Sequence, residues 1–115
     1  MSEFFDTPIF IQTYEVYKEI HKLRNSIPKQ DRCTIWQRVE NTTLEILEGI
    51  LTTTSSSKIK KLEILENTSH KLNMLKILVR LAKDTKIINI NKYIYLQEKL
   101  DEIGRMLGGW LRSTI

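Results

Sequence analysis

The sequence predicts an all-α protein, an antiparallel up-down-up-down four-helix bundle formed by a single domain over residues 1–115. Three observations carry this prediction. Glycine and proline are scarce, at 4 and 2 of 115 residues. Leucine, isoleucine, lysine and glutamate dominate, as is typical of helical proteins. Apolar residues recur at the spacing of one helix face. The chain is long enough to bury a core but small for an enzyme with a deep cleft.

We expect the first helix at about residues 8–26. Thr7 and Pro8 provide a capping hydroxyl and a proline at the first helical position, the usual signals of a helix start. Two series with a seven-residue spacing then mark its apolar face: Ile9, Val16 and Leu23, and Thr13, Ile20 and Ile27.

The second helix is expected at about 31–52, with Asp31 as its N-cap. Its apolar stripe comprises Trp36, Val39, Thr43, Ile46, Leu47 and Ile50. Six hydroxyl residues follow at positions 52–57. Because such side chains compete for backbone hydrogen bonds, this run predicts a loop.

The third helix, at about 58–85, is apolar on two sides. One seam comprises Leu65, Leu72, Leu75, Val79 and Ala82, and a second stripe comprises Met74, Ile77, Leu78 and Leu81. A helix that is apolar around most of its circumference is buried on more than one side. We therefore expect the second stripe to contact another subunit of a homo-oligomer. The alternative is that this helix is the most buried one of a monomer.

The fourth helix, at about 91–112, begins near Asn89 or Asn91 and carries a regular apolar stripe that ends at Trp110, which we expect in the core. Gly104, Gly108 and Gly109 interrupt it, although glycine costs roughly 1 kcal/mol against alanine inside a helix. Close approach of another backbone would justify such glycines, so we place Gly104 and Gly108 in the oligomer interface. Two simpler explanations stay open: relief of crowding where helices cross, and C-terminal capping at Gly109.

Positive charge concentrates on the third helix, in a chain of net charge +4. Residues 58–86 hold eight basic residues and three acidic ones. Lys76, Arg80 and Lys83 share one face by their spacing, and Lys58, Lys60 and Lys61 extend the charge to the helix start. These six residues are our candidates for nucleic-acid binding, since such stripes attract phosphate backbones. A solvated surface is an equally good interpretation of a single stripe.

Other polar residues do not form a catalytic pattern. The pairs Glu45/Glu48 and Glu63/Glu66 lie off the apolar stripes, where they are not expected to hold a metal ion in the core. His21, His70 and Cys33 lack ligand spacing to one another, and Cys33 is expected to be buried or idle. Asp101 and Arg105 are spaced to form an ion pair within the helix. We expect no enzyme activity, cofactor or metal, and, without a signal peptide or membrane span, a cytoplasmic protein.

Several segments together resemble the accessory variability determinant (Avd) proteins of diversity-generating retroelements. They are 14–18 (YEVYK), 27–32 (IPKQDR), 37–41 (QRVEN), 78–84 (LVRLAKD) and 102–110 (EIGRMLGGW). The likeness covers roughly residues 9–112. It implies a four-helix bundle that assembles as a homopentameric barrel with a positive surface. It also implies binding of the element's reverse transcriptase and of template-repeat RNA or DNA, in support of mutagenic retrohoming and without enzymatic activity.

Two alternatives to that function remain, besides a weaker third one, a metal-dependent helical enzyme that uses the Glu pairs. One is an oligomeric four-helix protein-interaction module that binds no nucleic acid, in which the charge serves solubility. The other is a related four-helix protein of the kind encoded in intervening sequences of large-subunit ribosomal RNA genes, although the small-residue-rich second helix associated with that group is absent.

Overall fold

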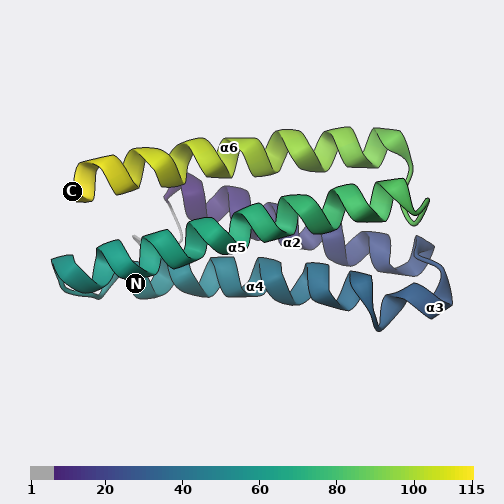
Figure 1. The fold of residues 1–115 in the computed structure, drawn as a ribbon, viewed down its shortest axis with the longest axis horizontal. Coiled ribbons are helices and arrows are strands. Elements are labelled where there is room, and N and C mark those ends of the chain that lie inside the picture. Colours follow the sequence, from purple (N-terminus) through teal and green to yellow (C-terminus); the bar gives the residue numbers. More distant parts are fainter. Residues whose placement is uncertain (1–6) are drawn as a thin grey trace.

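Four long helices lie side by side along one axis in the structure, a computed structural model that describes residues 7–115 (Figure 1). No strand occurs in this part, so the all-α prediction is confirmed. The long helices are α2 (Pro8–Leu23), α4 (Ile35–Thr54), α5 (Lys58–Asp84) and α6 (Ile90–Thr114), and the first connection holds a 3₁₀ turn, η1 (Arg24–Ser26), and the short α3 (Lys29–Arg32). Residues 1–6, part of the stretch that lacks a signal-peptide pattern, lie outside the described residues.

The helices form a ring in which each one packs against two neighbours, in the order α2, α4, α5, α6 and back to α2. Short connections join them at the ends of the bundle, with the α4–α5 turn at the end where α6 finishes and the α5–α6 turn at the other (Figure 1). The Cα atoms extend over 43 × 25 × 22 Å. Each helix therefore has one side toward the core, two flanks toward neighbours and one outer side.

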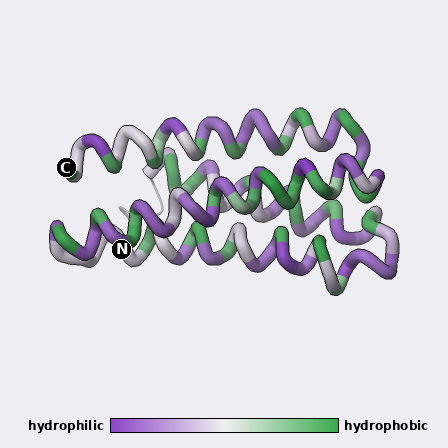
Figure 2. Tube along the Cα trace, viewed as in Figure 1, coloured by the Kyte–Doolittle hydropathy of each residue, from purple (hydrophilic) through white to green (hydrophobic). Residues whose placement is uncertain are grey.

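Amphipathic helices supply the core. Apolar and polar segments alternate along each helix (Figure 2), as burial of a single stripe requires. Trp36 is fully buried, and its indole Nε1 donates a hydrogen bond to the carbonyl oxygen of Ile20 at 3.0 Å, which ties α4 to α2. Of the two apolar sides of α5, the seam from Leu65 to Ala82 is the one that lies in the core.

The second long helix begins at Ile35, four residues later than predicted. Residues 29–32 form α3 instead, so Asp31 lies inside a separate turn and does not cap α4. The Arg32 guanidinium holds that turn, donating to the carbonyl oxygens of Ile27 and Asn25 at 3.0 Å each. The backbone changes direction at Thr34, where φ is −112° and ψ is −101°.

The predicted loop at 52–57 was also too long, because α4 continues to Thr54. Its threonines stay helical by donating their hydroxyls to carbonyl oxygens of the preceding turn. Thr52 bonds Glu48 at 2.8 Å and Thr53 bonds Gly49 at 2.7 Å. Thr53 is fully buried, so packing favours the helix as well.

The last helix starts where predicted and ends later. The Asn89 side chain accepts a hydrogen bond from the Lys92 backbone N–H at 2.9 Å, so Asn89 is the N-cap. The helix then runs through all three glycines to Thr114, and no described glycine has positive φ. Capping at Gly109 is therefore wrong. Trp110 is half-buried against the edge of the core, not fully inside it.

Candidate nucleic-acid interface

The predicted stripe on α5 faces α6, and acidic residues accompany it. Lys76 Nζ lies 3.0 Å from the Asp101 carboxylate of α6, and its side chain is 30% exposed. Asp101 thus pairs across helices, whereas the predicted Asp101–Arg105 pair does not form within 4.0 Å. Beside it, Gln97 Nε2 donates to the Lys76 carbonyl oxygen at 3.2 Å. Lys76 is therefore a bridge between α5 and α6 as well as a surface cation.

The other two stripe cations share one carboxylate, that of Asp84. Lys83 Nζ lies 3.2 Å from it and 4.5 Å from the centre of the Tyr93 ring, with its side chain 28% exposed. Arg80 Nε lies 3.9 Å from Asp84, and this side chain is 70% exposed. Asp84 and Asp101 together offset two of the three positive charges, and Arg80 projects furthest into solvent.

Lys58, Lys60 and Lys61 lie at the start of α5, at the opposite end of the bundle from the α5–α6 turn. Lys58 and Lys60 are exposed and Lys61 is half-buried, and none has a carboxylate within 4.0 Å among residues 7–115. From Lys61 to Lys76 there are fifteen residues, about 22 Å along the helix. The six predicted residues therefore form two separate groups, not one continuous patch.

The second apolar stripe of α5 points outward, with one exception. Met74, Ile77 and Leu81 are 41%, 60% and 46% exposed, while Leu78 is half-buried and packs against the core. Gly104 and Gly108 lie on α6. A Cβ atom on Gly104 would meet Leu72 Cδ2 and Lys76 Nζ, both at 3.5 Å, which is ordinary contact. Gly104, predicted for the oligomer interface, and Lys76, predicted for nucleic-acid binding, are thus direct neighbours.

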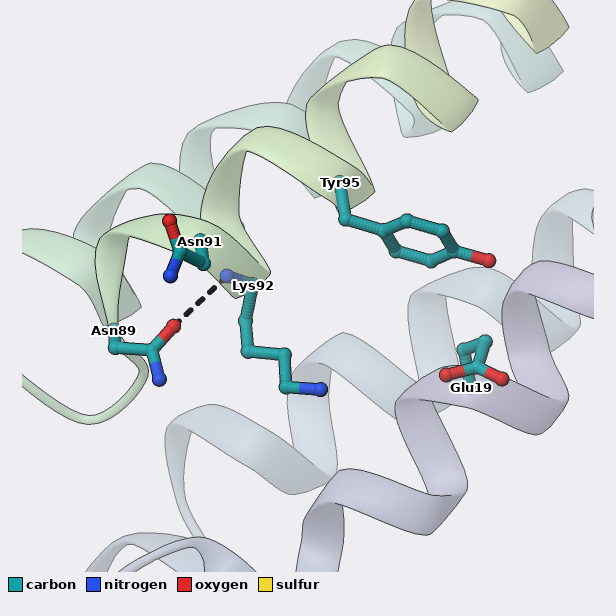
Figure 3. Close-up of a pocket in the computed structure, with 5 residues that line it drawn as sticks. All are labelled: Glu19, Asn89, Asn91, Lys92 and Tyr95. Atoms are coloured by element: carbon teal, nitrogen blue, oxygen red, sulfur yellow. Dashed lines mark hydrogen bonds between the residues drawn. The ribbon is translucent and has the colours of Figure 1, made fainter.

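The region around the α5–α6 turn contains features that sequence reasoning missed. Lys86 has φ of 63° and is the one non-glycine residue among 7–115 with positive φ. Lys92 and Tyr95 extend from α6 toward α2 and line a hollow of about 460 Å³ with Glu19, Asn89 and Asn91 (Figure 3). Helical spacing alone places Lys92 and Tyr95 on one face, so the sequence carries this signal, although the denser charge lies on α5.

One buried ionic cluster was also missed. Glu40 is 4% exposed and lies between α2 and α4. His21 Nδ1 lies 3.1 Å from its Oε1, and Arg24 donates to Oε2 and, at 3.3 Å, to the Gln37 side-chain oxygen. These bonds give the buried carboxylate its hydrogen-bond partners and join α2 to α4, so the cluster is a structural contact between helices.

The glutamates and the cysteine considered for metal binding or catalysis do not form a site in the part of the chain that the structure describes. Glu45 is paired with Lys71 at 3.6 Å, while Glu48, Glu63 and Glu66 are exposed. Cys33 is exposed, so of the two alternatives, a buried or an idle thiol, the buried one is wrong. Among residues 7–115, no three His, Cys, Asp or Glu side chains come close enough to share a metal ion. Within the same residues, no helix combines the length and apolar character that a membrane crossing needs.

These features define a class of protein: an all-helical bundle whose charged and apolar helix faces are its principal surface features. The model of the bAvd-like family matches residues 9–114, nearly the entire chain. The chain therefore belongs to the bAvd-like family, the accessory variability determinant proteins of diversity-generating retroelements, and the resemblance is confirmed. No curated protein matches the chain. Proteins of this family are retroelement accessory proteins and usually not catalytic.

Proposed function

We propose that this chain binds the retroelement's reverse transcriptase and its template-repeat RNA or cDNA, and so supports mutagenic retrohoming without being an enzyme. In this proposal it is an antiparallel up-down-up-down bundle that assembles as a homopentameric barrel in the cytoplasm. The observation that carries the proposal is the family match over residues 9–114.

Assembly is supported by the outer side of α5. Met74, Ile77 and Leu81 expose apolar area along two turns of one helix, and contact with a second copy would remove that area from water. The glycines of α6 add to this argument, since no tight contact within residues 7–115 requires them.

Nucleic-acid binding is supported by the cations on α5, with Arg80 as the most exposed of the stripe. Within one subunit the carboxylates of Asp84 and Asp101 weaken the field of the stripe. A ring of five copies would add the remaining positive charge into one larger field, because potentials from separate charges sum. Assembly and polyanion binding are therefore linked in this proposal.

The test is the triple variant Lys76→Gln, Arg80→Gln and Lys83→Gln, measured by RNA binding at several salt concentrations. Glutamine is preferred to glutamate because a new carboxylate would face Asp84 or Asp101. We expect affinity for template RNA to fall about tenfold or more, and the slope of log K against log salt to decrease by about 2. The matched control removes three charges elsewhere, with Lys18→Gln, Lys29→Gln and Arg38→Gln. An unchanged affinity in the α5 variant, with helicity and assembly intact, would refute this binding surface.

A second candidate function is a protein-interaction bundle that binds no nucleic acid. The specific observation in its favour is that all three stripe cations lie within 4.0 Å of a carboxylate, and two of them are less than one-third exposed. It predicts that the unmodified protein shows no salt-dependent RNA binding at any ionic strength. The family match favours the retroelement role over that of the ribosomal intervening-sequence proteins.

A further inference from the structure

The turn between α5 and α6 has a lysine where glycine is the common choice. Lys86 follows the C-cap of α5, its N–H bonds the Lys83 carbonyl oxygen at 3.0 Å, and the Ile87 N–H bonds that of Ala82 at 2.8 Å. This hydrogen-bond pattern places Lys86 in the left-handed conformation, with φ of 63°. An L-residue with a Cβ is less stable there than glycine. The turn is therefore less stable than it would be with glycine at position 86.

What the lysine adds is a positive charge held at the tip of the bundle. The next two residues, Ile87 and Ile88, are buried at 9% and 7% exposure, so they anchor the turn. Lys86 itself is exposed, and no carboxylate lies within 4.0 Å of its ammonium among residues 7–115. Lys83, next to it, is by contrast paired with Asp84. Lys86 is thus free to bind an anion.

The positive charge continues from the turn along α6. The hollow beside Lys86, of about 580 Å³, shares Asn89 with the hollow that Lys92 and Tyr95 line. Lys92 is exposed, and among the described residues it also lacks a carboxylate within 4.0 Å. The one carboxylate in that second hollow, Glu19, is paired with Lys22 at 3.6 Å. The hollow therefore keeps a positive balance.

An aromatic ring lies between the cations of this edge. Lys92, Tyr95 and Lys99 have i, i+3, i+7 spacing, so they share one face of α6. The Tyr95 ring is 42% exposed, and Lys99 Nζ lies 5.6 Å from its centre. Figure 3 shows the ring extending from α6 toward α2 with the Lys92 ammonium on the same side. The acidic residues Glu98, Asp101 and Glu102 line one hollow together with Lys99 and limit the positive region there.

We infer that this edge, formed by Lys86, Lys92, Tyr95 and Lys99, binds single-stranded RNA, with phosphates at the lysines and a base stacked on Tyr95. Alternating cations and an exposed ring suit a single strand, whose unpaired bases can stack, better than a duplex or an acidic peptide. The inference rests on the proposed function, because it gives the RNA a second contact surface besides the stripe on α5. It differs from that stripe in having an exposed aromatic ring, whereas Tyr93 beside Lys83 is half-buried, and in having unpaired lysines.

The first test compares Tyr95→Ala with Tyr95→Phe by fluorescence anisotropy, using a labelled 20-nucleotide oligouridylate and an RNA duplex of equal length. We expect Tyr95→Phe to bind the single strand as the unmodified protein does and Tyr95→Ala to bind it about five- to hundredfold more weakly. Binding of the duplex should stay unchanged in both. Equal single-strand binding by all three proteins would overturn the inference.

The second test uses Lys86→Gly, because this substitution should raise thermal stability and weaken RNA binding. Relief of the left-handed conformation should raise Tm by about 3–6 °C, while loss of the charge should weaken single-strand binding and lower the salt slope by about 0.7. Lys86→Arg should keep both properties of the unmodified protein, and Lys29→Gln, an exposed lysine on α3, should change neither. Unchanged RNA binding by Lys86→Gly would remove Lys86 from the site.

The outcomes separate this inference from the proposed function. If the unmodified protein binds no RNA at low salt, both fail. If the α5 glutamine variant loses RNA binding and the Tyr95 and Lys86 variants do not, the proposed function stands and this inference fails. The protein could also bind polyglutamate as tightly as it binds the oligouridylate, with neither affinity changed by Tyr95→Ala. That result would assign the edge to an acidic protein partner and refute the RNA site.

Discussion

The two flanks of α5 show two different kinds of helix packing around glycine. Toward α4, Gly49 lies so close to Thr68 that a Cβ atom on the glycine would be 2.2 Å from the threonine hydroxyl oxygen. Toward α6, a Cβ on Gly104 would be 3.5 Å from its nearest neighbours on α5, and one on Gly108 would meet the flexible end of Arg112, a residue of α6 itself, at 3.4 Å. The first contact requires glycine and the second does not.

This difference shows that a glycine inside a helix is not by itself a sign of close packing against a neighbouring helix of the same subunit. The sequence draws attention to the three glycines near the end of α6 because they cluster. The glycine that packing requires is Gly49, a single residue in the C-terminal half of α4. On the α6 flank the contact is made instead by the longer side chains of Lys76, Gln97 and Asp101.

The largest effect is expected for Gly49→Ala. Alanine favours a helix by roughly 1 kcal/mol over glycine, but overlap with Thr68 should outweigh this gain, for a net loss of about 1–3 kcal/mol in the free energy of unfolding. Urea denaturation followed by circular dichroism measures it. In a double-mutant cycle, Thr68→Ala should recover part of the loss, since the hydroxyl is the nearest atom. A Gly49→Ala protein as stable as the unmodified one would show that α4 and α5 separate at little cost.

Gly104→Ala and Gly108→Ala should have the opposite sign. Each is expected to stabilise the isolated subunit by about 0.5–1 kcal/mol, because the helix gains propensity and little is displaced. If a neighbouring subunit approaches these positions, the same substitutions should lower the assembled fraction in sedimentation velocity. A destabilised subunit would mean that α6 packs against α5 as closely as α4 does.

The smallest effect concerns the ion pair that takes the place of close packing at α6. A double-mutant cycle with Lys76→Gln and Asp101→Asn should give a coupling energy of about 0.2–1 kcal/mol, since both side chains are partly exposed to water. The coupling should decrease at 1 M salt, where charges are screened over about 3 Å. A coupling above 2 kcal/mol would make the pair a main support of the α5–α6 contact.

Local signals predicted the helices well where one residue or stripe decides the outcome. The helix predicted at 58–85 differs from α5 by one residue at its end. Asn89 caps α6 because its side chain accepts a hydrogen bond from the first turn. The boundaries that were wrong depend on side-chain hydrogen bonds and on burial, which residue spacing does not reveal. Ile35 begins α4 after a turn held by Arg32, and α4 passes Thr52 because hydroxyls bond the preceding turn and Thr53 is buried.

For the candidate sites, spacing predicted which side chains share a face but not what lies opposite them. Lys76, Arg80 and Lys83 share a side of α5, as expected, yet Asp101 of α6 and Asp84 next to Lys83 alter their charge. Lys86 was counted in the basic block, but its left-handed backbone cannot be foreseen when the usual glycine is missing.

The sequence by itself determined the helical class, the long apolar seam of α5, the concentration of positive charge on that helix and the family. These follow from composition, period and motif, which are local properties of the chain. Only the tertiary structure decided that Gly49 meets Thr68, that Lys76 crosses to Asp101 and that Tyr95 of α6 lines a hollow with Glu19 of α2. The physical reason is that distances between helices depend on how all four pack at once, and no single helix carries that information.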